Sequence, residues 1–153
     1  SFDPFTNGHL DIIDRASKIF EQVVVGVLVN TQKNGLFEMN ERIEMLNELL
    51  YDYNNITVEL FEGLLVDFCE QQNADAIVRG LRAVSDYENE LQLAHLNSHL
   101  SNGKYETLFM AASPEVSYLS SSAVREIAQM GGNITALVPA KVAEKTIRKY
   151  QGR

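Results

Sequence analysis

The chain has 153 residues and a mass of 17.2 kDa, which suits one domain with its own core and is too short for a catalytic domain plus a separate recognition domain. Its formal net charge of −8 argues against broad electrostatic binding to nucleic acid or to an anionic membrane. No apolar run approaches the roughly 20 residues of a membrane span, and the one cysteine can form no internal disulfide. We therefore expect a single domain over residues 1–153, in the cytoplasm, with no nucleic-acid or membrane partner.

The first half of the chain alternates between helix and strand patterns. A helix is predicted after residue 7, because apolar residues recur there at helical spacing: Leu10, Ile13, Ala16 and Phe20. Residues 22–29, "QVVVGVLV", form the β-branched run that is typical of a strand buried on both faces. After a loop over 30–37, Asn40 is expected to cap a second helix. A strand over 56–61 and a short helix over 64–72 follow.

The second half continues the alternation. Strands are predicted where "DAIVRG" ends at residue 80 and in "ETLFMAA" from residue 106. Helices are predicted over 86–100, 120–130 and 139–150, the last with Pro139 in its first turn. This pattern indicates an α/β fold, a Rossmann-like open parallel sheet with helices on both faces. Ligands of such sheets bind beyond the carboxyl ends of the strands.

The opening stretch "SFDPFTNGH" has the character of a loop between a strand and a helix. No strand precedes it in this sequence, so we expect the first, central strand of the sheet to be missing from this chain. The stretch lacks the charged and apolar segments of an export signal.

Three predicted loops that lead into helices hold the unusual residues: "TNGH" from residue 6, "RGLRAVSDYENE" from residue 79 and "YLSSSAVRE" from residue 118. Helix N-termini offer unpaired N–H groups and the positive end of a dipole, so three of them at one sheet edge favour a phosphate site. Arg79 and Arg82 add bidentate donors to this edge. The P-loop and dinucleotide fingerprints are both missing from the sequence, which therefore predicts a polyphosphate site of another kind.

These three motifs, in this order, resemble those of the bacterial phosphopantetheine adenylyltransferases, a family of the nucleotidyltransferase superfamily that is marked by [HT]-x-G-H. The resemblance covers essentially the whole chain. It implies transfer of the adenylyl group of ATP to 4′-phosphopantetheine, giving dephospho-coenzyme A and pyrophosphate in coenzyme A biosynthesis, with Mg²⁺ accompanying ATP. It also implies a homohexamer. A broad apolar face predicted on the long helix agrees with such assembly: Tyr87, Leu91, Leu93, Leu96 and Leu100.

The resemblance also assigns site residues. His9 would be the catalytic residue, stabilising the charge that grows at the α-phosphate. The residues expected to contact ATP are Ser1, Phe2, His9, Gly80, Leu81, Arg82, Glu90, Val116, Ser117, Tyr118, Leu119, Ser120, Ser121 and Ser122. The residues expected to contact 4′-phosphopantetheine are Ser1, Lys33, Leu65 and Arg79. No residue is expected to bind metal directly.

Several residues of the chain could equally have ordinary structural roles. Lys33 on its own would be a solvated loop lysine, and Glu90 belongs to an acidic helix start that favours the dipole. His95 and His99 lie one turn apart, but no third ligand is evident, so a packing or surface role is expected. Cys69 lies on an apolar stretch and is expected in the core.

Three other functions compete with the one that the resemblance implies. Other small nucleotidyltransferases often carry His where this chain has Thr6. A class I aminoacyl-tRNA synthetase would need room and positive charge for tRNA, which this chain lacks. The third alternative is a nucleotide sensor without activity. Pyrophosphate release on mixing with ATP, Mg²⁺ and 4′-phosphopantetheine would distinguish the implied function from these alternatives.

Overall fold

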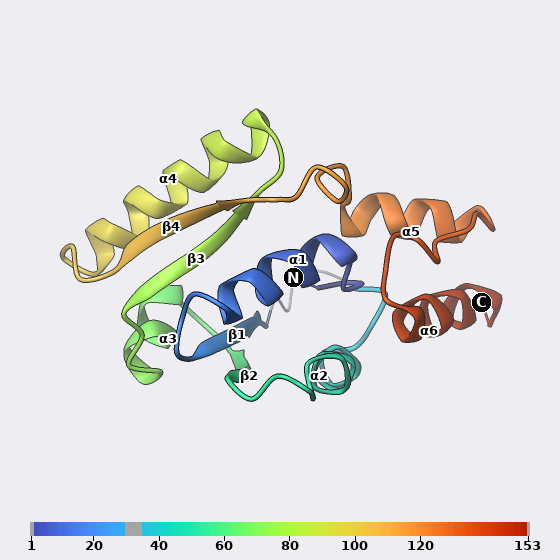
Figure 1. Cartoon of the computed structure of the whole chain (residues 1–153), viewed down its shortest axis with the longest axis horizontal. Coiled ribbons are helices and arrows are strands. Elements are labelled where there is room, and N and C mark those ends of the chain that lie inside the picture. Colours follow the sequence, from blue (N-terminus) through green and yellow to red (C-terminus); the bar gives the residue numbers. More distant parts are fainter. Residues whose placement is uncertain (1, 30–34, 153) are drawn as a thin grey trace.

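The computed structural model describes residues 2–29 and 35–152, and this part of the chain forms six helices and four strands (Figure 1). In chain order they are α1 (Asn7–Ser17), β1 (Val23–Leu28), α2 (Met39–Leu49), β2 (Ile56–Phe61), α3 (Leu65–Gln71), β3 (Ala76–Leu81), α4 (Val84–Leu100), β4 (Glu106–Ala111), α5 (Ser121–Gln129) and α6 (Ala140–Gln151). Strands alternate with helices from α1 to α5, so the predicted α/β class is confirmed. No described helix is long and apolar enough to cross a membrane.

Most predicted boundaries agree with the structure, and the exceptions are at the starts of helices. The N-cap of α2 is Glu38, whose N–H donates to Glu41, so Asn40 lies inside the first turn and the predicted cap was wrong. The helix starts early because the N–H groups of Leu36 and Phe37 are fixed on the Asp3 carboxylate just before it.

Two other helices also begin elsewhere than predicted. Pro139 is the N-cap of α6 rather than a residue of its first turn, and α4 begins at Val84, two residues before the predicted start. These shifts leave the order of elements unchanged.

The strands are parallel, and they form two separate pairs. Strand β1 pairs with β2, and β3 pairs with β4. Within the described residues no hydrogen bonds join the two pairs, so the single open sheet that we expected is present as two parallel halves. The parallel direction still brings the carboxyl ends of β3 and β4 together.

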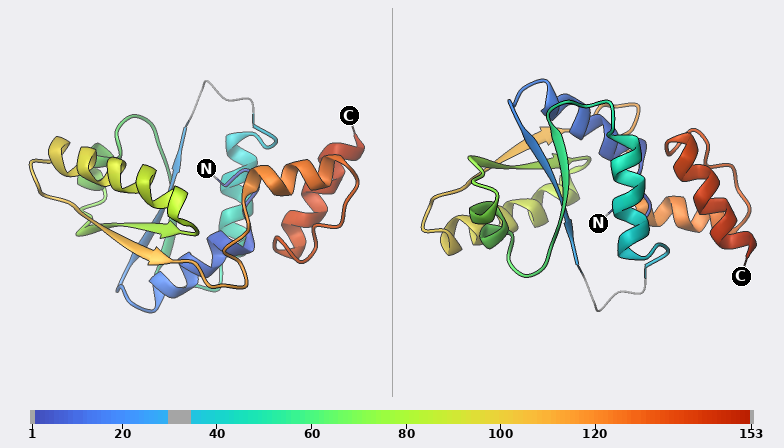
Figure 2. Two further views of the ribbon diagram at one scale, coloured as in Figure 1. Left: turned by 90° about the horizontal axis from the view of Figure 1, so that it is seen from above. Right: turned by 90° about the horizontal axis from the view of Figure 1, so that it is seen from below.

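Helix α1 contacts both β1 and β3 and so connects the two halves (Figure 1). It lies very close to β3, because a Cβ atom on Gly80 would be only 2.9 Å from Cγ1 of Ile12. Helix α4 covers β3 and β4 on the side away from α1. Figure 2 shows that α5 and α6 lie at one end of the molecule and that α3 and α4 lie at the other.

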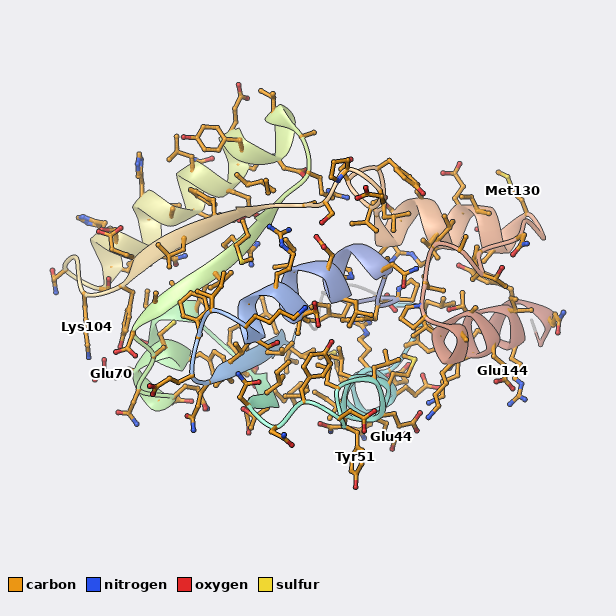
Figure 3. The ribbon with its side chains drawn as sticks, viewed as in Figure 1. Glu44, Tyr51, Glu70, Lys104, Met130 and Glu144 are labelled. Atoms are coloured by element: carbon orange, nitrogen blue, oxygen red, sulfur yellow. The ribbon has the colours of Figure 1, made fainter. Side chains whose placement is uncertain are left out.

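Two apolar clusters hold the elements together. The larger one includes fully buried residues of the first loop, of β1 and of the α5–α6 region, among them Phe5, Val27 and Ile134. The smaller one contains Val66, Cys69, Ile77 and Tyr105, which confirms the predicted core position of Cys69, and burial raises the pKa of its thiol. Beside this cluster, Glu70 and Lys104 form an ion pair at the end of the molecule far from α5 and α6 (Figure 3).

Candidate active site

The loop before α1 holds His9 in an aromatic setting. The ring of Phe5 is 1% exposed and belongs to the main core, so the loop is anchored from inside. The centroid of the His9 ring lies 4.9 Å from that of Phe2, edge to face, and 5.5 Å from that of Phe5. These contacts fix the plane of the imidazole.

A reciprocal cap at the start of α1 fixes the same ring from the polar side. Thr6 is the N-cap, and its Oγ1 accepts a hydrogen bond from the backbone N–H of His9 at 3.3 Å. In return the backbone N–H of Thr6 donates to Nδ1 of His9 at 2.9 Å. Burial, and after it the charge of Arg82, lowers the pKa of His9 to about 4. The ring is therefore neutral near pH 7.

At the end of β3 two arginines are each held by a carboxylate of α4. Arg79 binds Glu90 through Nε at 2.7 Å and through Nη2 at 2.8 Å, and these bonds raise the pKa of Arg79. Arg82 binds Asp86 through Nε at 2.9 Å and Nη2 at 3.0 Å, which lowers the pKa of Asp86. Bidentate pairs of this kind fix the plane of the guanidinium as well as its position.

The third loop connects β4 to α5 and touches the other two. Nη1 of Arg82 donates to the carbonyl of Leu119 at 2.6 Å, and Oγ of Ser121 donates to the carbonyl of Pro4 at 2.8 Å. Ser120 caps α5, accepting from the N–H of Ala123 at 3.1 Å. A Cβ on Gly8 would lie 3.4 Å from the carbonyl oxygen of Val116, so the start of α1 packs directly on this loop. The three predicted loops therefore meet at the carboxyl ends of β3 and β4.

Two acidic residues that were not identified from the sequence, Asp3 and Asp11, hold these loops in place through hydrogen bonds. Asp3 accepts hydrogen bonds from the N–H groups of Leu36 and Phe37, at 2.9 and 3.0 Å, and pairs with the guanidinium groups of Arg42 and Arg125, at 3.4 and 3.7 Å. It therefore ties the first loop to α5 and to the segment that leads into α2. The opening stretch has the character of a loop in the sequence, but nothing there indicates such distant partners.

Asp11 fastens α1 to the third loop in a similar way. Its carboxylate accepts from the N–H of Ser113 at 3.0 Å and from the hydroxyl of Ser113 at 2.7 Å. Arg15 extends this connection by donating to the carbonyl of Ala111 at 2.8 Å. Burial opposes ionisation, but the bonds from Ser113 outweigh it and lower the pKa of Asp11. Asp11 and Arg15 thus hold α1 in register with the end of β4.

Comparison with known proteins supports the resemblance seen in the motifs. A family model described as cytidylyltransferase-like matches residues 1–127. The chain is 55% identical over 150 residues to the phosphopantetheine adenylyltransferase of Thermobifida fusca, covering 98% of this chain and 90% of that one. It is 51% identical over 153 residues to the Streptomyces coelicolor protein of the same name, covering 100% and 95% of the two chains. The chain belongs to the phosphopantetheine adenylyltransferase family.

A solved structure agrees with this family at the level of the fold. It comes from Vibrio parahaemolyticus and is provisionally assigned as a nicotinate-nucleotide adenylyltransferase. It matches with a TM-score of 0.69 at 16% identity and covers 95% of this chain and 93% of that one. At that identity the match shows a shared Rossmann-like architecture.

The structure brings together most of the residues that the resemblance assigns to ATP. Those that lie on the three converging loops, or in the strand and helix ends that these loops join, are Phe2, His9, Gly80, Leu81, Arg82, Val116, Ser117, Tyr118, Leu119, Ser120, Ser121 and Ser122. Glu90 lies on α4, where its carboxylate pairs with Arg79. Leu65 begins α3 and packs on the smaller apolar cluster, and no recorded contact joins it to the three loops. Ser1 and Lys33 lie outside the described residues.

The described residues contain no group of three His, Cys, Asp or Glu side chains arranged as metal ligands. His95 and His99 are both on α4, outside the three loops. The site itself offers a neutral imidazole, two oriented guanidinium groups and a helix start rich in serine, which can bind and align phosphate groups.

Proposed function

We propose that this chain transfers the adenylyl group of ATP to 4′-phosphopantetheine. A phosphate oxygen of the acceptor forms a bond to the α-phosphorus of ATP, and the bond from that phosphorus to the bridging oxygen breaks. Pyrophosphate leaves with the electron pair, and dephospho-coenzyme A is the product. The identity of 51–55% to curated relatives of this name over nearly their full length supports the proposal.

The observation that carries the proposal is the fixed position of His9 where the three loops meet. The imidazole is neutral and fixed by Thr6 and two aromatic rings, and the charge of Arg82 reaches it. A fixed N–H donor and a guanidinium group at the same site suit the negative charge that develops on the α-phosphate in the transition state. We assign His9 to the reacting phosphate and Arg82 to the neighbouring phosphates of ATP.

The substrate contacts are proposed on the same basis. ATP would lie along Phe2, residues 80–82, Glu90 and residues 116–122. The phosphate of 4′-phosphopantetheine would meet Arg79, together with Ser1 and Lys33, and its arm would pass Leu65. The rest of the reaction needs little from the protein, because an acceptor phosphate with a second pKa of about 6 is already largely dianionic near neutral pH. No general base or covalent nucleophile is required.

Mg²⁺ enters this proposal as part of the nucleotide substrate. The phosphates of ATP would supply oxygen ligands to the ion, as is usual for Mg²⁺ bound with a nucleotide. Bound there, the ion would neutralise charge on the leaving pyrophosphate. We also propose a homohexamer, working in the cytoplasm, as the assembled enzyme.

Pyrophosphate release tests the function directly. The protein is mixed with ATP, Mg²⁺ and 4′-phosphopantetheine, and pyrophosphate is followed by a coupled assay. We expect release only when all three are present. Two control reactions should stay at background. In one, nicotinate mononucleotide replaces 4′-phosphopantetheine. In the other, CTP and an alcohol phosphate replace both substrates, as for a cytidylyltransferase. ATP binding without any pyrophosphate release would favour a sensor and overturn the proposal.

A further inference from the structure

The contact between Thr6 and His9 fixes more than the position of the ring. A backbone N–H can only donate a hydrogen bond, and that of Thr6 points at Nδ1 of His9 from 2.9 Å. Nδ1 must therefore present its lone pair. In a neutral imidazole one nitrogen carries the proton and the other accepts, so the proton is on Nε2.

The Thr6 hydroxyl is compatible with the same assignment. Its oxygen accepts from the backbone N–H of His9 at 3.3 Å and lies 3.0 Å from Nδ1, which lets its proton point at the same lone pair. The backbone here is well anchored: Thr6 is 2% exposed, and the N–H of Asn7 donates to the carbonyl of Leu137 at 3.0 Å. Rotation of Thr6 away from the ring would break the cap of α1.

The surroundings of the ring also disfavour a second proton. The imidazole meets the aromatic rings of Phe2 and Phe5 from the first loop. From the end of β3, Arg82 adds a positive charge that lowers the pKa of His9, although less than burial does. Among residues 2–29 and 35–152, no carboxylate is recorded in contact with the ring. A proton on Nδ1 would also face the N–H of Thr6.

We propose that Thr6 is a positioning residue that holds His9 as the neutral tautomer with its proton on Nε2, so that this N–H is the group presented to the reacting phosphate. His9 then acts as a fixed hydrogen-bond donor and does not transfer a proton during the reaction. That the N–H of Nε2 meets the reacting phosphate rests on the proposed function. The tautomer itself does not, because it follows from contacts within the chain.

Nitrogen NMR of the ¹⁵N-histidine-labelled protein, without substrates, measures the tautomer. We expect Nδ1 of His9 to show the signal of an unprotonated nitrogen and Nε2 that of a protonated one, unchanged between pH 8 and pH 5. The signals are assigned with His9→Gln, since the chain has two other histidines, His95 and His99. A proton on Nδ1, a mixture of tautomers or a doubly protonated ring at pH 7 would overturn the proposal.

A pair of variants tests the role of the Thr6 side chain. Thr6→Val keeps the volume and the backbone N–H but loses the hydroxyl, whereas Thr6→Ser keeps the hydroxyl. We expect Thr6→Val to keep the proton on Nε2, because its backbone N–H remains, but to lower kcat roughly 5- to 10-fold with little change in KM for ATP, as for the loss of one hydrogen bond that positions the ring. Thr6→Ser should restore kcat. A folded Thr6→Val protein with native kcat would refute the role of the Thr6 side chain.

The two proposals fail in different ways. If the native protein shows the expected tautomer but releases no pyrophosphate, the proposed function is wrong and the tautomer stands. If it releases pyrophosphate while Nδ1 carries the proton, the function stands and the role of Thr6 is wrong. Should Thr6→Val fail to fold, Thr6→Ser and the NMR of the native protein still decide the question.

Discussion

Arg79 and Glu90 face each other in a bidentate ion pair, with arginine Nε and Nη2 2.7 and 2.8 Å from the two carboxylate oxygens. The family resemblance assigned these residues to different substrates, Arg79 to the acceptor phosphate and Glu90 to ATP. Their contact links the proposed ATP site to the proposed site for the acceptor phosphate. A phosphate that reaches Arg79 meets a guanidinium group whose orientation Glu90 has already set.

Alanine variants of the two β3 arginines should separate the two substrates. Arg79→Ala should raise KM for 4′-phosphopantetheine by roughly 10- to 100-fold while ATP binding changes little, because a charge-assisted hydrogen bond contributes about 1.5–3 kcal/mol. Arg82→Ala should show the reverse pattern. Steady-state kinetics and calorimetric titration of ATP measure both effects. Equal losses for both ligands in Arg79→Ala would reject its assignment to the acceptor.

Substitutions of His9 can separate catalysis from helix capping. His9→Ala should lower kcat by roughly 10²–10³-fold, the usual effect of removing one preorganised donor. It also leaves the N–H of Thr6 without its partner, so the free energy of unfolding should fall by about 1 kcal/mol. His9→Gln should lose a comparable part of kcat but keep the stability, since Gln at this position can close a capping box. Near-native turnover in a folded His9→Ala protein would remove His9 from catalysis.

The buried imidazole should also give the stability a particular pH dependence. His9 has a pKa of about 4 in the folded chain and an ordinary value near 6.5 when unfolded. Between these values the unfolded state binds a proton that the folded state does not, so stability should fall as the pH drops from about 6.5 to about 4. The fall should reach roughly 3 kcal/mol. Urea titrations across this range should show a smaller fall for His9→Gln, and identical curves would contradict the burial of His9.

Much of the fold could be predicted because its signals are local. The β-branched run over 22–29 and the helix predicted over 120–130 each depend on neighbours within one element, and both are confirmed, as Val23–Leu28 and Ser121–Gln129. The cap of α2 was predicted wrongly at Asn40 because its start is set by Asp3, more than 30 residues away in the chain. Short-range patterns carry no information about such a contact.

The same limit applies to the site. The sequence identified the three loops, because glycine, arginine and serine gathered where strands lead into helices favour phosphate binding. It did not identify Asp86, since an acidic residue in the first turn of a helix is common wherever it meets the helix dipole, and it did not identify Asp11, since nothing near it in the chain indicates its partner. Asp86 acts through Arg82. Asp11 acts through Ser113, which lies 102 residues away in the chain and reaches it only in the folded protein.

Asp3 should therefore be important for stability, and Glu48 offers a matched control. Asp3→Ala leaves two buried N–H groups and Arg42 without their acceptor and should cost about 2–4 kcal/mol. Glu48 also pairs with two cations, Lys141 and Lys145, at 3.8 and 3.5 Å, but its side chain is 45% exposed. Glu48→Ala should cost less than about 1 kcal/mol. Equal unfolding free energies for the two variants would show that the Asp3 contacts contribute little.

The last prediction concerns assembly and depends on α4. In the single chain Leu93, Leu96 and Leu100 are 47%, 50% and 51% exposed along this helix, so their side chains are available to a partner chain. If α4 lies in the proposed hexamer interface, light scattering at micromolar concentration should report roughly six times the 17.2 kDa chain mass, because obligate interfaces of about 2,000 Å² or more dissociate little.

Charge placed on that face should break the assembly. Leu96→Glu would bury an unpaired carboxylate in the interface, so its mass should fall towards that of the single chain. Met130→Glu is the matched control, because Met130 is 79% exposed at the far end of α5 (Figure 3), and it should leave the mass unchanged. A native protein that scatters as a monomer would refute the hexamer. A hexameric Leu96→Glu protein would place the interface elsewhere than on α4.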